Sequence, residues 1–323
     1  SCTFILLLLL LVSKENISLW ILFICLGLLF DYRKDKKAIR YLLVFASISI
    51  IYFLLVTYVV MPSISNNGTY PHFHYSALGN NSYEAFKYLI SHPSECIKML
   101  FINHINHPSG NYVKLELHIF LLISGLFMLC FKPNYLIMLI PIYFQKLFHD
   151  NYIMWSIDAQ YSIEFAPILT IGVFSVISKY KKRYLVNTLS AIVLIGTLIS
   201  TIRTMDNTVV YTNKSKIRIY QPRHYKRNYN VKLIHKHINK IPQNAIISAQ
   251  SPFLPHLALR DNIYLFPIVK DAEYIILSSK EDPYPISKEI FDSEMEKIMN
   301  SKKWQKFFKN EDLIIFKRIS DNI

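Results

Sequence analysis

The stretch RKDKKAIRYLLVFASISIIYFLLVTYVVM, residues 33–61, joins five basic side chains to a long apolar run. Its apolar part, residues 41–61, has the roughly 20 residues that a helix needs to cross a bilayer core of about 30 Å. Lys and Arg concentrate in the cytoplasmic loops of membrane proteins. This stretch therefore predicts a membrane-spanning helix that follows a cytoplasmic loop.

Six more apolar runs flank this one: residues 2–12, 17–30, 115–131, 135–148, 163–178 and 185–201. Because they are shorter, these helices must tilt less, recruit flanking Tyr and Trp, or stay partly inside a bundle. Lipid accommodates many such runs, whereas the core of a soluble domain does not. The sequence excludes a soluble protein and predicts a multi-pass, α-helical protein of the inner (plasma) membrane.

Basic residues set the expected orientation. Residues 31–40 and residues 179–183 are both rich in Lys and Arg, and a turn at Lys132-Pro133 lies between them along the chain. If these loops are cytoplasmic, then residues 13–16, 62–114, 149–162 and everything after Thr201 lie outside.

Composition limits the partners. The formal charge is +14, but it is spread over the inner loops and a Lys-rich tail with no basic motif of a nucleic-acid fold, so we expect the lipid bilayer, and no nucleic acid, as partner. Three of the four cysteines lie in apolar runs, which leaves no disulfide framework. The chain opens with Ser inside an apolar run, so we expect a fragment that lacks upstream helices.

The last part of the chain changes character at about residue 203. Short strand-like runs occur at residues 245–249, 263–266, 274–277 and 313–316, with amphipathic helical patterns around 231–240 and 287–308. We therefore predict two domains. They are a transmembrane helical domain at residues 1–202 and a small extracytoplasmic α/β domain with a mostly parallel sheet at residues 203–323.

Lys14 and Glu15 form an ionisable pair between two apolar runs. Such residues are costly in lipid and usually face a bundle interior or a watery cavity. One interpretation is that the two residues bind a phosphate and a hydroxyl group of a substrate. The alternative is a simple cap at the membrane interface.

The outer loop of residues 62–114 is rich in His and Tyr. His72 with His74, or His104 with His107, has the spacing of metal ligands, but neither pair has a Cys or carboxylate partner nearby. A divalent metal stays an open alternative to solvated histidines. Residues 70–79, including Tyr75, more readily form a lid or a substrate-facing surface.

Three carboxylates lie close to the predicted outer surface: Asp150, Asp158 and Glu164. Each is a candidate general base or metal ligand. Asp158 and Glu164 have the alternative role of capping a helix N-terminus, where negative charge is favourable. Pro167 predicts a kink in the helix that follows.

In the predicted α/β domain, Gln250, His256 and Arg260 follow a buried strand and precede the next one. Polar side chains at strand ends often line a cleft. The alternative is that each of them satisfies backbone groups of its own domain.

The chain resembles the membrane family named domain of unknown function 2079. The resemblance rests on Lys14-Glu15, Tyr75 through Leu78-Gly79, Gln160-Tyr161 through Pro167, and Gln250 through His256, Arg260 and Phe266-Pro267. Members look like relatives of the GT-C glycosyltransferases, which take sugars from polyprenyl-phosphate donors on the outer membrane face. The resemblance implies a catalytic carboxylate in an upstream loop that this chain lacks, and Gln160 stands where many members have His.

The resemblance therefore implies a GT-C-like membrane glycosyltransferase with a polyprenyl-phosphate-linked sugar as donor. We expect its site residues to lie around one cavity on the outer face: Lys14, Glu15, Tyr75, Gln160, Tyr161, Glu164, His256 and Arg260. The alternative class is a non-catalytic membrane protein, either a transporter or an envelope assembly factor. A transporter should carry ionisable residues in mid-span, and these spans carry few.

Overall fold

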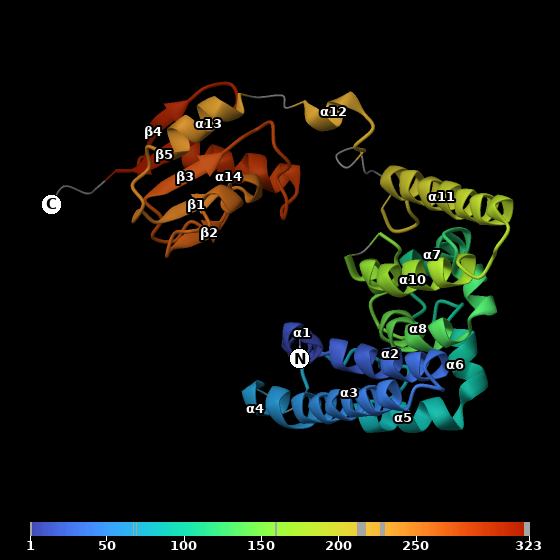
Figure 1. The fold of residues 1–323 in the computed structure, drawn as a ribbon. Helices are drawn as coiled ribbons and strands as arrows, with labels where there is room; N and C mark the ends of the chain where they lie inside the picture. The colour runs from blue at the N-terminus through green and yellow to red at the C-terminus, as the bar shows by residue number, and fades with distance from the viewer. Residues whose placement is uncertain are drawn as a thin grey trace. The chain divides into compact units, whose positions relative to one another are not determined.

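The chain divides into two compact units, Ser1–Arg218 and Ile219–Ile323, called here the helical unit and the α/β unit. The computed structural model describes residues 2–66, 68, 70–158, 160–211, 218–226 and 230–319. Figure 1 labels the elements of both units.

The helical unit contains α1 (Cys2–Ser13), α2 (Ile17–Asp31), α3 (Lys36–Leu55), the π-helical η1 (Val56–Val60), α4 (Met61–Ile64), α5 (Ser82–Ser91), α6 (Pro93–Met99), η2 (Pro108–Gly110), α7 (Val113–Ile123), η3 (Leu126–Phe131), α8 (Asn134–Leu147), α9 (Tyr152–Trp155), η4 (Gln160–Glu164), α10 (Phe165–Ile177) and α11 (Arg183–Asp206). The elements η2, η3 and η4 are 3-10 helices.

Three helical stretches in the described residues are long and apolar enough to cross a membrane, namely Lys36–Ile64, Tyr152–Ile177 and Arg183–Asp206. The sequence had indicated only the first as long enough. The last one has 24 residues because its helix continues past the apolar run at both ends. The remaining apolar helices are shorter.

The helices pack as a row of neighbours. Helix α2 lies against both α3 and α8, α8 lies against α10, and α7 lies against α11 (Figure 1). The contact of α7 with α11 is very close, because a Cβ atom on Gly196 would come within 2.0 Å of the Ile123 carbonyl oxygen. Small residues permit this kind of close approach between helices in membranes.

The fourth apolar run is not one helix. It breaks after α7 at Gly125, whose φ of +112° favours glycine, and continues as the short η3. The expected kink at Pro167 is also absent. Helix α10 begins at Phe165, so Pro167 lies in the first turn, where its missing N–H has no partner to lose.

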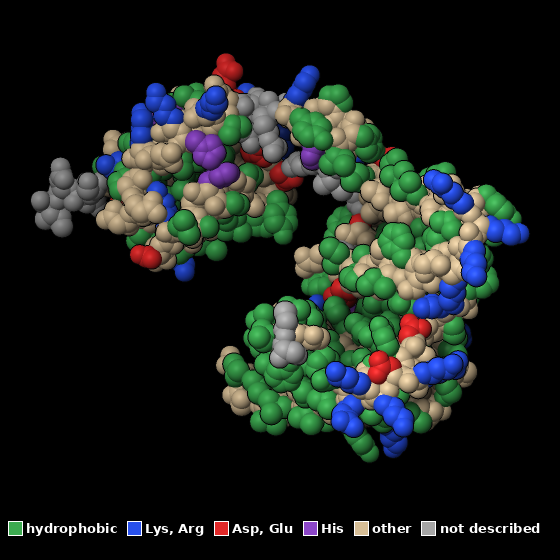
Figure 2. All heavy atoms as spheres, viewed as in Figure 1, with side chains coloured by type: hydrophobic (Ala, Val, Ile, Leu, Met, Phe, Trp, Pro, Cys, Tyr) green, Lys and Arg blue, Asp and Glu red, His purple; other side chains and the backbone are tan. Residues whose placement is uncertain are grey.

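The basic loops meet at one end of these helices, which we call the basic end. Lys132 Nζ lies 3.4 Å from Asp31, the last residue of α2, and Lys179 Nζ donates to the Phe131 carbonyl at 3.4 Å. Figure 2 shows Lys and Arg gathered along one edge of the helical unit. The expectation that residues 31–40, 132–133 and 179–183 share one side agrees with these contacts.

The α/β unit contains α12 (Pro222–Tyr225), α13 (Val231–Ile238), β1 (Ile247–Ala249), η6 (Ser251–His256), β2 (Ile263–Leu265), β3 (Tyr274–Leu277), α14 (Lys288–Asn300), β4 (Trp304–Lys309) and β5 (Ile314–Arg318). The strands form one sheet in the order β2-β1-β3-β5-β4. Ile234 and Ile238 of α13 pack with Ile276 of β3, whereas Phe291 of α14 packs with Ile275. Successive side chains of a strand point to opposite faces, so the two helices cover opposite faces of the sheet.

Two details of this unit differ from the prediction. Strand β1 pairs in parallel with β2 and β3, but β5 pairs antiparallel with β3 and β4, so the sheet is mixed. Helix α14 ends at Asn300, and the following residues, predicted as helix up to Phe308, form β4. Asn310 accepts from the backbone N–H of Asp312 and Leu313 in the tight turn after β4. Such a short connection joins antiparallel strands only.

Candidate functional site

An ion pair joins the turn after the first helix to the middle of the chain. Lys14 Nζ lies 3.1 Å from Glu164 Oε1, although 150 residues separate them. The Lys14 ammonium also faces the rings of Trp20 and Tyr161, at 5.5 and 5.4 Å from their centroids. Cation–π contacts of this kind stabilise a charge that is partly withdrawn from water.

Local structure explains why these side chains are free to meet. Lys14 lies in the turn between α1 and α2, and its carbonyl accepts from the Ile17 N–H. Glu164 occupies the N-cap position of α10 but makes no side-chain capping bond. Its carboxylate binds Lys14 instead, so the capping alternative does not describe Glu164.

Tyr70 and Tyr75 join the same cluster from the outer loop. Burial, and after it the nearby carboxylate of Glu15, raises the pKa of Tyr70 to about 12. Tyr75 donates to the Gln145 carbonyl at 3.2 Å. Burial raises the pKa of Tyr75, with smaller contributions from Tyr70 and Glu164. Both phenols stay protonated at neutral pH and act as hydrogen-bond donors.

The loop that carries these tyrosines is tied to the end of α8. Asp150 accepts hydrogen bonds from the Ser76 N–H and hydroxyl, at 2.9 and 2.8 Å, and donates its own N–H to the His74 carbonyl. The rings of His74 and His149 lie 5.5 Å apart. Asp150 therefore holds the loop in place.

A second lysine lies behind Glu164. Lys146 is 2 % exposed, and its Nζ donates to the Ser156 carbonyl at 2.9 Å. Asp158 accepts from the hydroxyls of Ser156 and Thr208, the latter at 2.6 Å. Asp158 thus fastens the segment after α11 to the segment before α10.

A third lysine is buried away from this cluster. Lys114 Nζ bonds the Met99 carbonyl and lies 2.8 Å from His104 Nδ1 and 4.2 Å from the Trp155 ring centroid. Burial, helped by the charge of Lys114, lowers the pKa of His104 to about 4. His104 is therefore neutral at physiological pH and accepts a hydrogen bond from Lys114.

No group of three His, Cys, Asp or Glu side chains that could hold a metal ion occurs in the part of the chain that the structure describes. His107 stacks on Tyr152 and His72 lies against Tyr70, so these histidines are engaged with aromatic rings.

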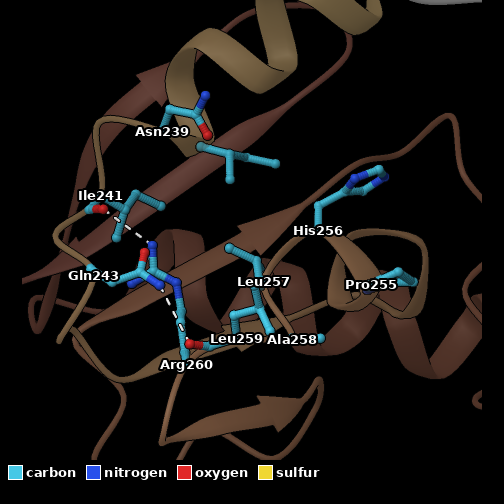
Figure 3. A pocket seen from close by; sticks show the side chains of 10 residues that line it. Asn239, Ile241, Gln243, Pro255, His256, Leu257, Ala258, Leu259 and Arg260 are labelled. Atoms are coloured by element: carbon cyan, nitrogen blue, oxygen red, sulfur yellow. Dashed lines mark hydrogen bonds between the residues drawn. The ribbon is translucent and has the colours of Figure 1, made fainter.

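The α/β unit has a cavity of its own, with a volume of about 320 Å³ (Figure 3). Arg260 lies in it and donates to the carbonyls of Ile241 and Pro242. His256 lies at the rim, with its ring 4.6 Å from that of His235. Arg260 therefore satisfies its own unit's backbone. Gln250 does the same, because it bonds Ser278, Glu281 and Asp282 and is buried.

The helical unit thus brings together five of the predicted site residues, which we call the site cluster: Lys14, Glu15, Tyr75, Tyr161 and Glu164. Gln160 is exposed, and His256 and Arg260 belong to the other unit. Sequence reasoning missed Trp20, whose indole N–H donates to Gln145 Oε1 at 2.7 Å. It also left out Lys146, although a lysine inside an apolar run was a visible signal.

These features define a class. A helical unit with apolar outer surfaces, buried lysines and three membrane-length helices is an integral membrane protein. Residues 1–315 match the family described as "Predicted membrane protein (DUF2079)", and the chain belongs to this family. No curated protein and no solved structure matches the chain.

Proposed function

We propose that this protein is a GT-C-like membrane glycosyltransferase whose site cluster binds the phosphate of a polyprenyl-phosphate-linked sugar at the outer face of the inner membrane. The observation that carries the proposal is the Lys14–Glu164 ion pair at 3.1 Å, with Glu15 beside it and Lys146 behind it. Two ammonium groups near two carboxylates offer a phosphate site together with candidate proton acceptors.

The depth of the cluster supports a lipid-borne ligand. Helix α8 has 14 residues and spans about 21 Å at 1.5 Å per residue. The basic end, where Lys132 meets Asp31, lies at its start, and Gln145 lies near its other end. A bilayer core is about 30 Å thick, so the cluster lies in the outer part of the core, about 9 Å short of its far boundary. Lipid phosphates lie just beyond that boundary.

In the proposed reaction, an acceptor hydroxyl attacks the anomeric carbon of the sugar as the bond to the lipid phosphate breaks. Lys14 stabilises the negative charge that grows on the leaving phosphate. Glu15 takes the hydroxyl proton, and the phenol of Tyr70 lies close to the Glu15 carboxylate.

The test is binding of undecaprenyl phosphate to the full chain in detergent, measured by native mass spectrometry. We expect Lys14→Ala to weaken binding at least tenfold, because an ion pair with phosphate is lost. The matched control is Lys132→Ala, which removes an ion-paired lysine at the basic end. Equal binding by both variants and the parent chain would contradict the proposal.

A transporter is the second candidate, because two lysines are buried in the helical unit, one near the start of α7 and one near the end of α8. Lys114 and Lys146 are each 2 % exposed inside the helical unit, where ionisable residues mark transport pathways in many membrane proteins. The two functions differ in the product. A transferase releases polyprenyl phosphate from the sugar-linked lipid, whereas a transporter moves its ligand across vesicles without cleaving it.

A further inference from the structure

Helices α5 and α6 in the outer loop each carry a series of exposed, large apolar side chains. We call Tyr83, Phe86, Ile90, Ile97 and Phe101 the apolar face, and they are between 57 and 70 % exposed. On α5 the first three are spaced i, i+3 and i+7, which places them on one side of the helix. On α6 and just after it, Ile97 and Phe101 are spaced i and i+4.

The opposite side of these helices already has a core. Ala85 of α5 and Cys96 and Met99 of α6 are buried with Leu78 and Phe148. The helices are therefore fixed to the helical unit by one side. The apolar face stays exposed. Monomeric soluble proteins rarely expose an apolar patch of this kind.

The position of Phe148 sets the depth of α5 and α6. Phe148 directly follows α8, whose other end carries Asn134 bonded to Asp31 at the basic end. The length of α8, about 21 Å, is less than the roughly 30 Å thickness of a bilayer core. Elements that pack on Phe148 thus lie at or inside the outer boundary of the hydrocarbon, where an outward face meets lipid.

We propose that α5 and α6 are interfacial helices whose apolar face is embedded in the outer leaflet of the membrane. Tyr83 and Phe86 are aromatic residues of the kind enriched at membrane interfaces. Lys87 and Lys98 are exposed beside the apolar face, with stems long enough to bring the ammonium groups to the headgroups. This assignment does not depend on the proposed transferase function, since it requires only the membrane character of the chain.

The test uses nitroxide labels on single cysteines in the full chain, with the native cysteines replaced by Ala. The protein is reconstituted in vesicles of phosphatidylcholine with a minority of phosphatidylglycerol. Test positions are Phe86→Cys, Ile90→Cys and Ile97→Cys, and matched controls on the same helices are the exposed polar positions Glu84→Cys, Ser91→Cys and Glu95→Cys. Collision rates with dissolved oxygen and with a water-soluble nickel chelate are measured by paramagnetic resonance.

Labels on the apolar face should collide with oxygen several-fold more often than with the nickel chelate, because oxygen partitions into hydrocarbon. The control labels should show the reverse. Equal, high access of both sets to the chelate overturns the proposal in favour of a water-exposed surface. Immobile labels shielded from both reagents also overturn it, since they assign the apolar face to contact with another protein.

Discussion

The helical unit and the α/β unit distribute their side chains in opposite ways. The helical unit buries Lys114 and Lys146 and exposes Leu194 and Ile195 in the middle of α11. The α/β unit buries Ile275 and Ile276 on both faces of β3 and carries the lysines of α14 outside. Each arrangement suits a different solvent, because lipid favours apolar surfaces and water favours polar ones. The comparison indicates that the surface of the helical unit suits lipid and the surface of the α/β unit suits water.

The prediction with the largest expected effect changes one exposed leucine in each unit. Leu194 is 60 % exposed in α11 and Leu259 is 94 % exposed in the α/β unit. In water, either change to Asp at such an exposed position would cost less than about 1 kcal/mol. If α11 crosses the membrane, Leu194→Asp costs about 3 kcal/mol, roughly a hundredfold bias against insertion of that helix.

The amount of full-length protein in alkali-washed membranes measures this effect. We expect Leu194→Asp to be strongly depleted and Leu259→Asp to equal the parent chain. Equal amounts of both variants would show that the exposed surface of α11 does not face lipid.

The second test concerns the sides of the membrane that the two units occupy. We expect the basic end to be cytoplasmic and the α/β unit to be outside, since basic loops stay in the cytoplasm. In a variant without native cysteines, an impermeant reagent applied to intact cells should label Lys302→Cys and leave Lys36→Cys unlabelled until the cells are opened. The reverse pattern would invert the topology, and labelling at both positions would mean that the membrane was breached.

Much of the architecture could be predicted from the sequence, because it depends on local patterns. Apolar length defined the helices around residues 41–61 and 185–201, and short runs of Ile, Leu and Phe defined four of the five strands. Strand β4 was missed because the residues around Phe307 also fit the amphipathic pattern of the preceding helix. The break at Gly125 was missed, although a glycine inside an apolar run was a local signal.

Part of the site could also be predicted, because it depends on a local pattern. Lys14 and Glu164 stand out because charge is costly beside apolar runs, and the structure joins them. Trp20 and Gln145 look ordinary in the sequence, and only the packing of α2 against α8 brings them together. The cost of burying a charge is thus visible in a sequence, whereas the neighbour that offsets the cost belongs to the tertiary structure.

The prediction with the smallest expected effect compares one histidine in each unit. His104 in the helical unit has its pKa lowered to about 4 by burial and by Lys114, whereas the ordinary value is 6.5. Between these values the unfolded chain binds a proton that the folded chain does not, so stability falls as the pH falls from 6.5 to 4 and is fully present above 6.5. In the α/β unit, His237 lies on Phe308, and its pKa is lowered by slight burial and then by Lys240 and Lys236.

We therefore expect His104→Asn to reduce the loss of Tm between pH 7 and pH 5 by several degrees, and His237→Asn to change it little. Asn keeps an acceptor for Lys114 but cannot titrate. Tryptophan fluorescence in detergent reports the transition, because the Trp155 ring lies 4.9 Å from that of His104. Carboxylates also titrate in this range, but they are common to both variants and cancel in the comparison. An equal flattening of the pH dependence by His237→Asn would place the sensitive groups in the α/β unit, contrary to the burial that separates the two histidines.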